Sequence, residues 1–164
     1  MLKTSFDKHG LEESRFQEDK TLPAQRIKAT IRFDYRGKAR PSRFFFGGKN
    51  IEEVAEELRQ QQAALWRNVP IQGVIVENIE LGEIYTVYDE EAEDEVAFAP
   101  LELDVVTENL DDLVRFAVRE EFRRVQIHEP EKMEMPRNEL EKIFFQIHEQ
   151  LKTQFFLKVK RLQD

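Results

Sequence analysis

Residues 26–35, Arg-Ile-Lys-Ala-Thr-Ile-Arg-Phe-Asp-Tyr, alternate polar and apolar side chains without a fault. Successive side chains of a β-strand point to opposite faces of the sheet, so this pattern predicts a half-buried strand. Its apolar face contains Ile27, Ala29, Ile31, Phe33 and Tyr35. The predicted sheet is built outward from this strand.

A second strand and a helix are expected next. A polar turn over residues 37–41 leads to a short strand at 43–46, which pairs with the first strand as an antiparallel hairpin. Asn50 is followed three residues later by Glu53, which is the spacing of a capping box. These two residues begin a predicted helix over residues 50–68.

Three further strands are predicted in the middle of the chain. Residues 71–76 are rich in β-branched side chains and are typical of a buried strand. Residues 84–88 and 96–105 form two more strands, and the acidic run 89–95 is their hairpin tip. Pro100 cannot donate a backbone hydrogen bond, so it indicates a sheet edge or a bulge.

The C-terminal part is predicted to be a helical hairpin. Asn109 caps a first helix whose apolar face continues to Val125, and Pro130 and Pro136 bracket the loop. A second helix begins near Asn138. Its expected core-facing stripe is Leu140, Ile143, Phe144, Ile147, Leu151 and Phe155.

Phe145, Phe156 and Val159 lie off that stripe, so the last helix is apolar on more than one face. A helix of this kind must bury its further apolar face somewhere, which predicts self-association, most simply as a homodimer. Residues 153–161 also alternate like a strand, and periodicity leaves both readings open.

The predicted architecture is α+β: a mixed or mostly antiparallel sheet of about five strands packs against one helix, and a C-terminal helical hairpin follows. Residues 1–23 are expected to be a loosely ordered arm. Residues 24–164 form a single domain, with the sheet and helix in 24–106 and the helical hairpin in 107–164.

Composition limits the class of protein. The 164-residue chain is long enough for one core, 40% of it is hydrophobic, and it contains no cysteine, which excludes disulfides and thiolate metal sites. It contains no long apolar segment and no signal-peptide pattern, so we expect a cytoplasmic protein without membrane contact.

Charge is unevenly distributed in this acidic protein. Residues 24–49 carry eight bases and one acid, whereas residues 50–113 carry eighteen acids and two bases, within a net charge of −8. Bases and aromatic side chains around the predicted hairpin at 26–49 suggest phosphate contact and base stacking. The nucleic-acid-binding candidates are Arg32, Arg36, Lys38, Arg40, Arg43 and Phe45.

No arrangement of nucleophile, base and orienting group emerges from the sequence, so we expect a non-enzymatic module without a cofactor. The pairs His128-Glu129 and His148-Glu149 lack the spacing of known metal sites. If the chain is an enzyme, Glu120, Glu121 and these histidines are the first candidates. The predicted function is a protein-interaction or regulatory module that binds itself or another protein, and the alternative is a nucleic-acid-binding accessory protein.

Overall fold

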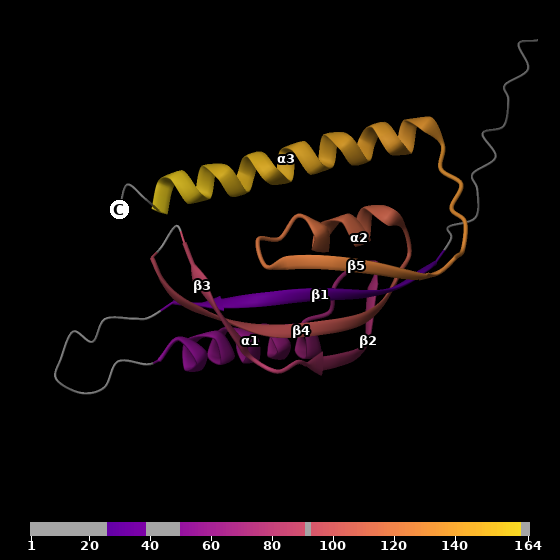
Figure 1. Ribbon diagram of the computed structural model, residues 1–164. Helices are drawn as coiled ribbons and strands as arrows, with labels where there is room; N and C mark the ends of the chain where they lie inside the picture. Colours follow the sequence, from indigo (N-terminus) through magenta and orange to yellow (C-terminus); the bar gives the residue numbers. More distant parts are fainter. Residues whose placement is uncertain (1–25, 39–49, 91–92, 162–164) are drawn as a thin grey trace, which may run out of the picture.

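A computed structural model describes residues 26–38, 50–90 and 93–161 (Figure 1). The predicted arm and the predicted strand at 43–46 lie outside these residues. The described elements are β1 (Ile27–Gly37), α1 (Ile51–Asn68), β2 (Val74–Leu81), β3 (Tyr85–Asp89), β4 (Asp94–Thr107), α2 (Leu110–Ala117), β5 (Phe122–Glu129) and α3 (Arg137–Arg161).

The strands form one five-stranded sheet in which every pairing is antiparallel. The strand order is β2-β4-β1-β5, and β3 pairs with β4 beyond the end of β2. α1 connects β1 to β2 with β4 between them, which is a split βαβ arrangement. The α+β class and the mostly antiparallel sheet packed against a helix are therefore confirmed.

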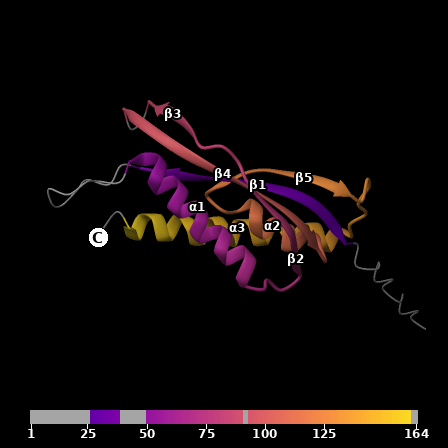
Figure 2. The ribbon, with the colours of Figure 1, turned by 90° about the horizontal axis from the view of Figure 1, so that it is seen from below.

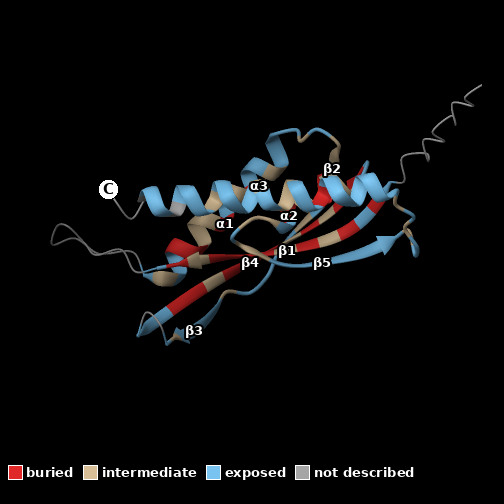
Figure 3. Cartoon of the chain, turned by 90° about the horizontal axis from the view of Figure 1, so that it is seen from above, coloured by how far each residue is buried: buried red, intermediate tan, exposed pale blue. Residues whose placement is uncertain are grey.

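The core lies on one face of β1 and β4. The alternation predicted for β1 is confirmed, because Ile27, Ala29, Ile31, Phe33 and Tyr35 are all buried. The ring of Phe33 stacks on Trp66 of α1 with centroids 6.1 Å apart, and Trp66 lies 5.4 Å from Phe116 of α2. Both helices thus cover the same face, and Figure 3 shows the buried residues concentrated along β1 and β4.

The start of α1 follows from its sequence. The Asn50 side chain accepts from the Glu53 backbone N–H at 2.7 Å, and the Glu53 carboxylate accepts from the Asn50 N–H at 3.2 Å. Both bonds of the predicted capping box are present, and they satisfy two backbone donors at the helix start.

The strand predicted at 71–76 is displaced, and its burial was wrong. Gly73 has a φ of +77° and makes a turn, so β2 begins only at Val74. Val74 and Val76 of this edge strand are only partly buried against the core, and Ile75 between them points to the opposite face and is largely exposed. An apolar run does not distinguish an edge strand from a central one.

Pro100 occupies a local edge inside β4. It lies opposite Asp34 of β1, at the place where β2 has ended and β3 begins on the other side. Arg59 of α1 reaches this gap and donates to the carbonyls of Gly82 and Pro100. Pro100 therefore lies at a local sheet edge, as its missing backbone N–H predicted.

The predicted C-terminal helical hairpin was wrong. Its first helix ends at Ala117 as the short α2, and the chain then returns as β5, which pairs with β1. The apolar spacing of residues 122–129 fits a helix as well as a strand. A strand, however, also pairs with the backbone of β1, whose edge would otherwise be unpaired. α3 is a single helix that continues through residues 153–161, so the strand reading of that segment was also wrong.

Candidate interaction surfaces

α3 forms an outer layer on the molecule. It begins after Pro136, whose carbonyl accepts from the N–H groups of Glu139 and Leu140 at 3.1 and 3.2 Å. Figure 1 shows the helix lying above α2 as a separate layer. Among the described residues, it contacts the rest of the domain along one narrow edge: Ile143 is buried, Ile147 is half-buried, and Gln154 donates to the Val118 carbonyl.

Most of the apolar surface of α3 is uncovered. Phe144 is 64% exposed and Phe155 is 71% exposed. The exposed large apolar residues of this helix are Leu140, Phe144, Phe145, Leu151, Phe155, Phe156, Leu157 and Val159. A contiguous apolar surface of this kind marks an interaction site on a soluble protein.

The core-facing stripe expected for this helix was largely wrong. Leu140, Phe144, Leu151 and Phe155 face solvent, because α3 rests on the domain by the edge that contains Ile143. The predicted self-association residues Phe145, Phe156 and Val159 are also exposed. At about 100° per residue, the exposed stripe and these three residues form one arc around the helix.

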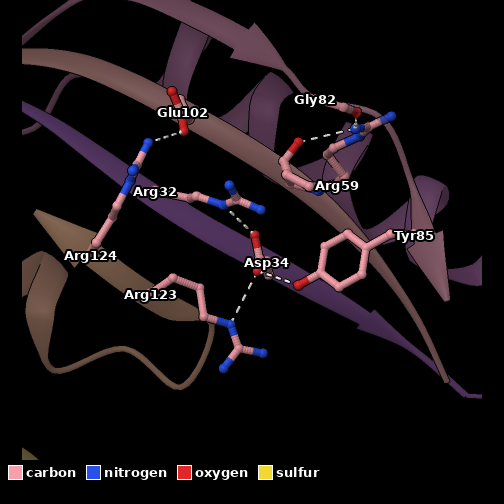
Figure 4. A network of polar contacts seen from close by, with 9 residues as sticks. Arg32, Asp34, Arg59, Gly82, Tyr85, Glu102, Arg123 and Arg124 are labelled. Carbon is pink, nitrogen blue, oxygen red and sulfur yellow. Dashed lines mark hydrogen bonds and ion pairs between the residues drawn. The ribbon is translucent and has the colours of Figure 1, made fainter. Parts of the chain in front are cut away.

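The uncovered face of the sheet carries a polar network centred on Asp34 (Figure 4). Asp34 is only 4% exposed, and its carboxylate accepts from Arg32 Nε at 2.9 Å, Arg123 Nε at 3.2 Å and the Tyr85 hydroxyl at 2.7 Å. The hydrogen bond from Arg32 to Asp34 raises the pKa of the guanidinium. Burial, with the bond to Asp34, raises the pKa of Tyr85.

Ion pairs extend this network across the sheet. Lys28 pairs with Glu129 at 3.6 Å, Arg124 pairs with Glu102 at 2.9 Å, and Arg36 pairs with Asp89. The described bases of β1 and β5 on this face thus have carboxylate partners. The arrangement stabilises a solvated face and reduces the positive charge available to a phosphate.

The predicted nucleic-acid-binding residues lie in different environments in the structure. Arg32 and Arg36 belong to the ion pairs, while Lys38 is exposed at the end of β1. Phe33 and Tyr35, the aromatic residues beside them, are core residues. Arg40, Arg43 and Phe45 lie outside the described residues, so nucleic-acid binding stays a prediction.

The two histidines that the structure describes do not come together. His128 is on β5, where its Nε2 lies 2.8 Å from Thr30 Oγ1, and Thr30 donates to Asp104 at 2.6 Å. His148 is on the exposed side of α3. Within the described part of the chain, no three His, Asp or Glu side chains form a group able to hold a metal ion.

The network around Asp34 was missed by the sequence analysis. Tyr85 and Arg123 stand 51 and 89 positions away from Asp34, and only the strand pairings bring them together. A signal existed, since Asp34 is the single acid among the bases of residues 24–49. An isolated acid on a basic strand face is expected to have basic partners.

No protein-family model, curated protein or solved structure matches this chain. Among the described helices, none is long and apolar enough to cross a membrane.

Proposed function

We propose that this protein is a non-enzymatic interaction module that self-associates, and that α3 is the surface through which it does so. The observation that carries the proposal is the uncovered apolar arc of α3. The bases on the uncovered face of the sheet are paired with carboxylates. The phenylalanines of α3, by contrast, expose most of their apolar rings to solvent. Burying aromatic side chains supplies a large share of the energy of most protein interfaces.

Sedimentation equilibrium at micromolar concentration tests the proposal. We expect the wild type to sediment as a dimer and the double variant Phe144→Gln with Phe155→Gln to sediment as a monomer with unchanged circular dichroism. The matched control is Ile75→Gln with Tyr88→Gln, since these side chains are 59% and 64% exposed but lie outside α3. A wild type that is monomeric throughout this range contradicts the proposal.

A second pair of substitutions tests the residues predicted from sequence. Phe145 and Phe156 lie about 80–120° around the helix from Phe144 and Phe155, at the border of the exposed arc. Phe145→Gln with Phe156→Gln should therefore weaken the dimer by a smaller factor than the first pair. Equal losses for both pairs would place the centre of the interface between them.

A further inference from the structure

We infer that the C-terminal end of α3 docks on the acidic start of α1 in a second copy, and that the two copies make this contact reciprocally. This inference rests on the proposed function, and it names the surface that α3 binds. It is carried by the exposure of this helix end and by the opposite charges of the two surfaces.

The C-terminal end of α3 leaves the domain. Gln154 donates to the Val118 carbonyl, and beyond Gln154 every side chain of the helix that the structure describes is exposed. Figure 1 shows this end extending past α2. Phe155, Phe156 and Leu157 are consecutive and each at least 50% exposed, so apolar groups project over about 200° of the helix surface. A helix packed alongside covers a narrower stripe, so we expect a hollow partner surface that encloses this end.

The same end of α3 is basic. Residues 150–161 contain four bases and no acid. Lys152 pairs with Glu149 at 3.7 Å, but both side chains are largely exposed, so this ion pair is weak and leaves the charge accessible. The rest of the chain carries a charge of −12. An anionic bilayer would therefore attract this end and repel the domain, which favours an acidic protein surface as the partner.

The start of α1 is a surface of this kind. Residues 50–59 carry four acids and one base, Arg59. The four acids, Glu52, Glu53, Glu56 and Glu57, border a hollow of about 460 Å³ that Asn50 and Ile84 also line. This volume lies in the range of about 300–1,000 Å³ that is usual for binding pockets. An apolar side chain within an acidic border complements exposed phenylalanines with basic neighbours.

The two surfaces lie where a closed dimer needs them. Figures 1 and 2 both show the C-terminal end of α3 and the start of α1 at the same end of the molecule. In a two-fold dimer, a surface that meets a second surface of the partner also receives the reverse contact. A two-fold axis at this end of the molecule can therefore place each α3 end at the α1 start of the other copy.

Charge reversal tests the pairing of these two surfaces. The α3-reversed variant carries Lys152→Glu with Lys160→Glu, and the α1-reversed variant carries Glu52→Lys with Glu57→Lys. Each variant alone opposes like charges at both contacts, so its dimer Kd in sedimentation should rise roughly tenfold or more. An equimolar mixture restores opposite charges at both contacts of the mixed dimer, so the Kd should return close to the wild-type value.

Matched controls separate this pairing from net charge. Lys132→Glu with Lys142→Glu, and Glu131→Lys with Glu134→Lys, change the net charge equally at exposed residues outside both surfaces. We expect both controls to dimerise like the wild type. Circular dichroism checks that every variant keeps its fold.

Two results would overturn this inference and leave the proposed function intact. The first is an α1-reversed variant that dimerises like the wild type, since α3 would then bind a different surface. The second is a mixture that fails to restore the dimer. A monomeric wild type would overturn both proposals, and its cosedimentation with phosphatidylglycerol vesicles would identify lipid as the partner of α3 instead.

Discussion

At the scale of single residues, Tyr35 provides a test of the core. Its side chain is buried beneath the helices, and burial raises the pKa of its hydroxyl to about 12. The unfolded chain has a tyrosine pKa near 10, so it loses its proton first as the pH rises. The contribution of Tyr35 to stability is therefore complete below about pH 10 and is lost as the pH rises toward 12.

Urea unfolding at pH 9 and pH 11 measures this effect. We expect the free energy of unfolding of the wild type to fall between these pH values by about 1 kcal/mol more than that of Tyr35→Phe. The variant keeps the ring and loses only the titrating hydroxyl. Equal pH dependence in the two proteins would show that Tyr35 titrates normally in the folded state.

Residues also show where sequence reasoning reaches its limit. The burial of Phe33 and Tyr35 was readable from alternation alone, because a strand with a covered face fixes which side chains point inward. The position of Asp34 in a network with Arg123 and Tyr85 was not readable, since it depends on strand order. Local spacing predicts on which face of the sheet a side chain lies. It does not predict which side chains from distant parts of the sequence will contact it.

At the scale of elements, the contact between β1 and α1 depends on Gly37. A Cβ atom placed on this glycine would lie 2.0 Å from the Ile51 carbonyl oxygen and 2.6 Å from the Ala55 nitrogen. These are backbone atoms, so no side-chain rotation relieves the contact. The absence of a side chain at Gly37 lets the first turns of α1 approach the strand closely.

Gly37→Ala is therefore expected to lower the free energy of unfolding by about 3 kcal/mol, at the upper end of overpacking effects. Chemical denaturation provides the measurement. Lys38→Ala is the control, because Lys38 is the exposed neighbour and such surface changes stay within about 0.5 kcal/mol. A fully stable Gly37→Ala protein would show that α1 moves away from β1 without cost.

Elements with strong local signals were predicted well, and those defined by neighbours were not. α1 was fixed by the capping box of Asn50 and Glu53 together with its apolar period. The segment 122–129 fits helical spacing and strand alternation equally, and pairing with the edge of β1 decides between them. For α3, periodicity identified an apolar helix, but the narrow contact through Ile143 determines which of its apolar residues remain exposed.

At the scale of the whole molecule, β3 and β4 extend as a hairpin past the end of β2, as Figure 2 shows. Arg36 of β1 pairs there with Asp89 of β3. The unequal charges of the two sequence segments thus meet in the fold, where Asp89 of the middle segment compensates Arg36 of β1. Segregation along the sequence does not by itself produce a basic surface.

This compensation leads to an expectation for nucleic acid. The protein carries a net charge of −8, and the described bases of β1 and β5 on the open sheet face are paired with carboxylates. We expect the wild type and the variant Lys38→Glu, Arg40→Glu and Arg43→Glu to give the same weak fluorescence anisotropy signal with single-stranded RNA at two salt concentrations. Binding confined to the wild type and weakening steeply with salt would instead support the nucleic-acid alternative, because neutralising phosphates releases counterions.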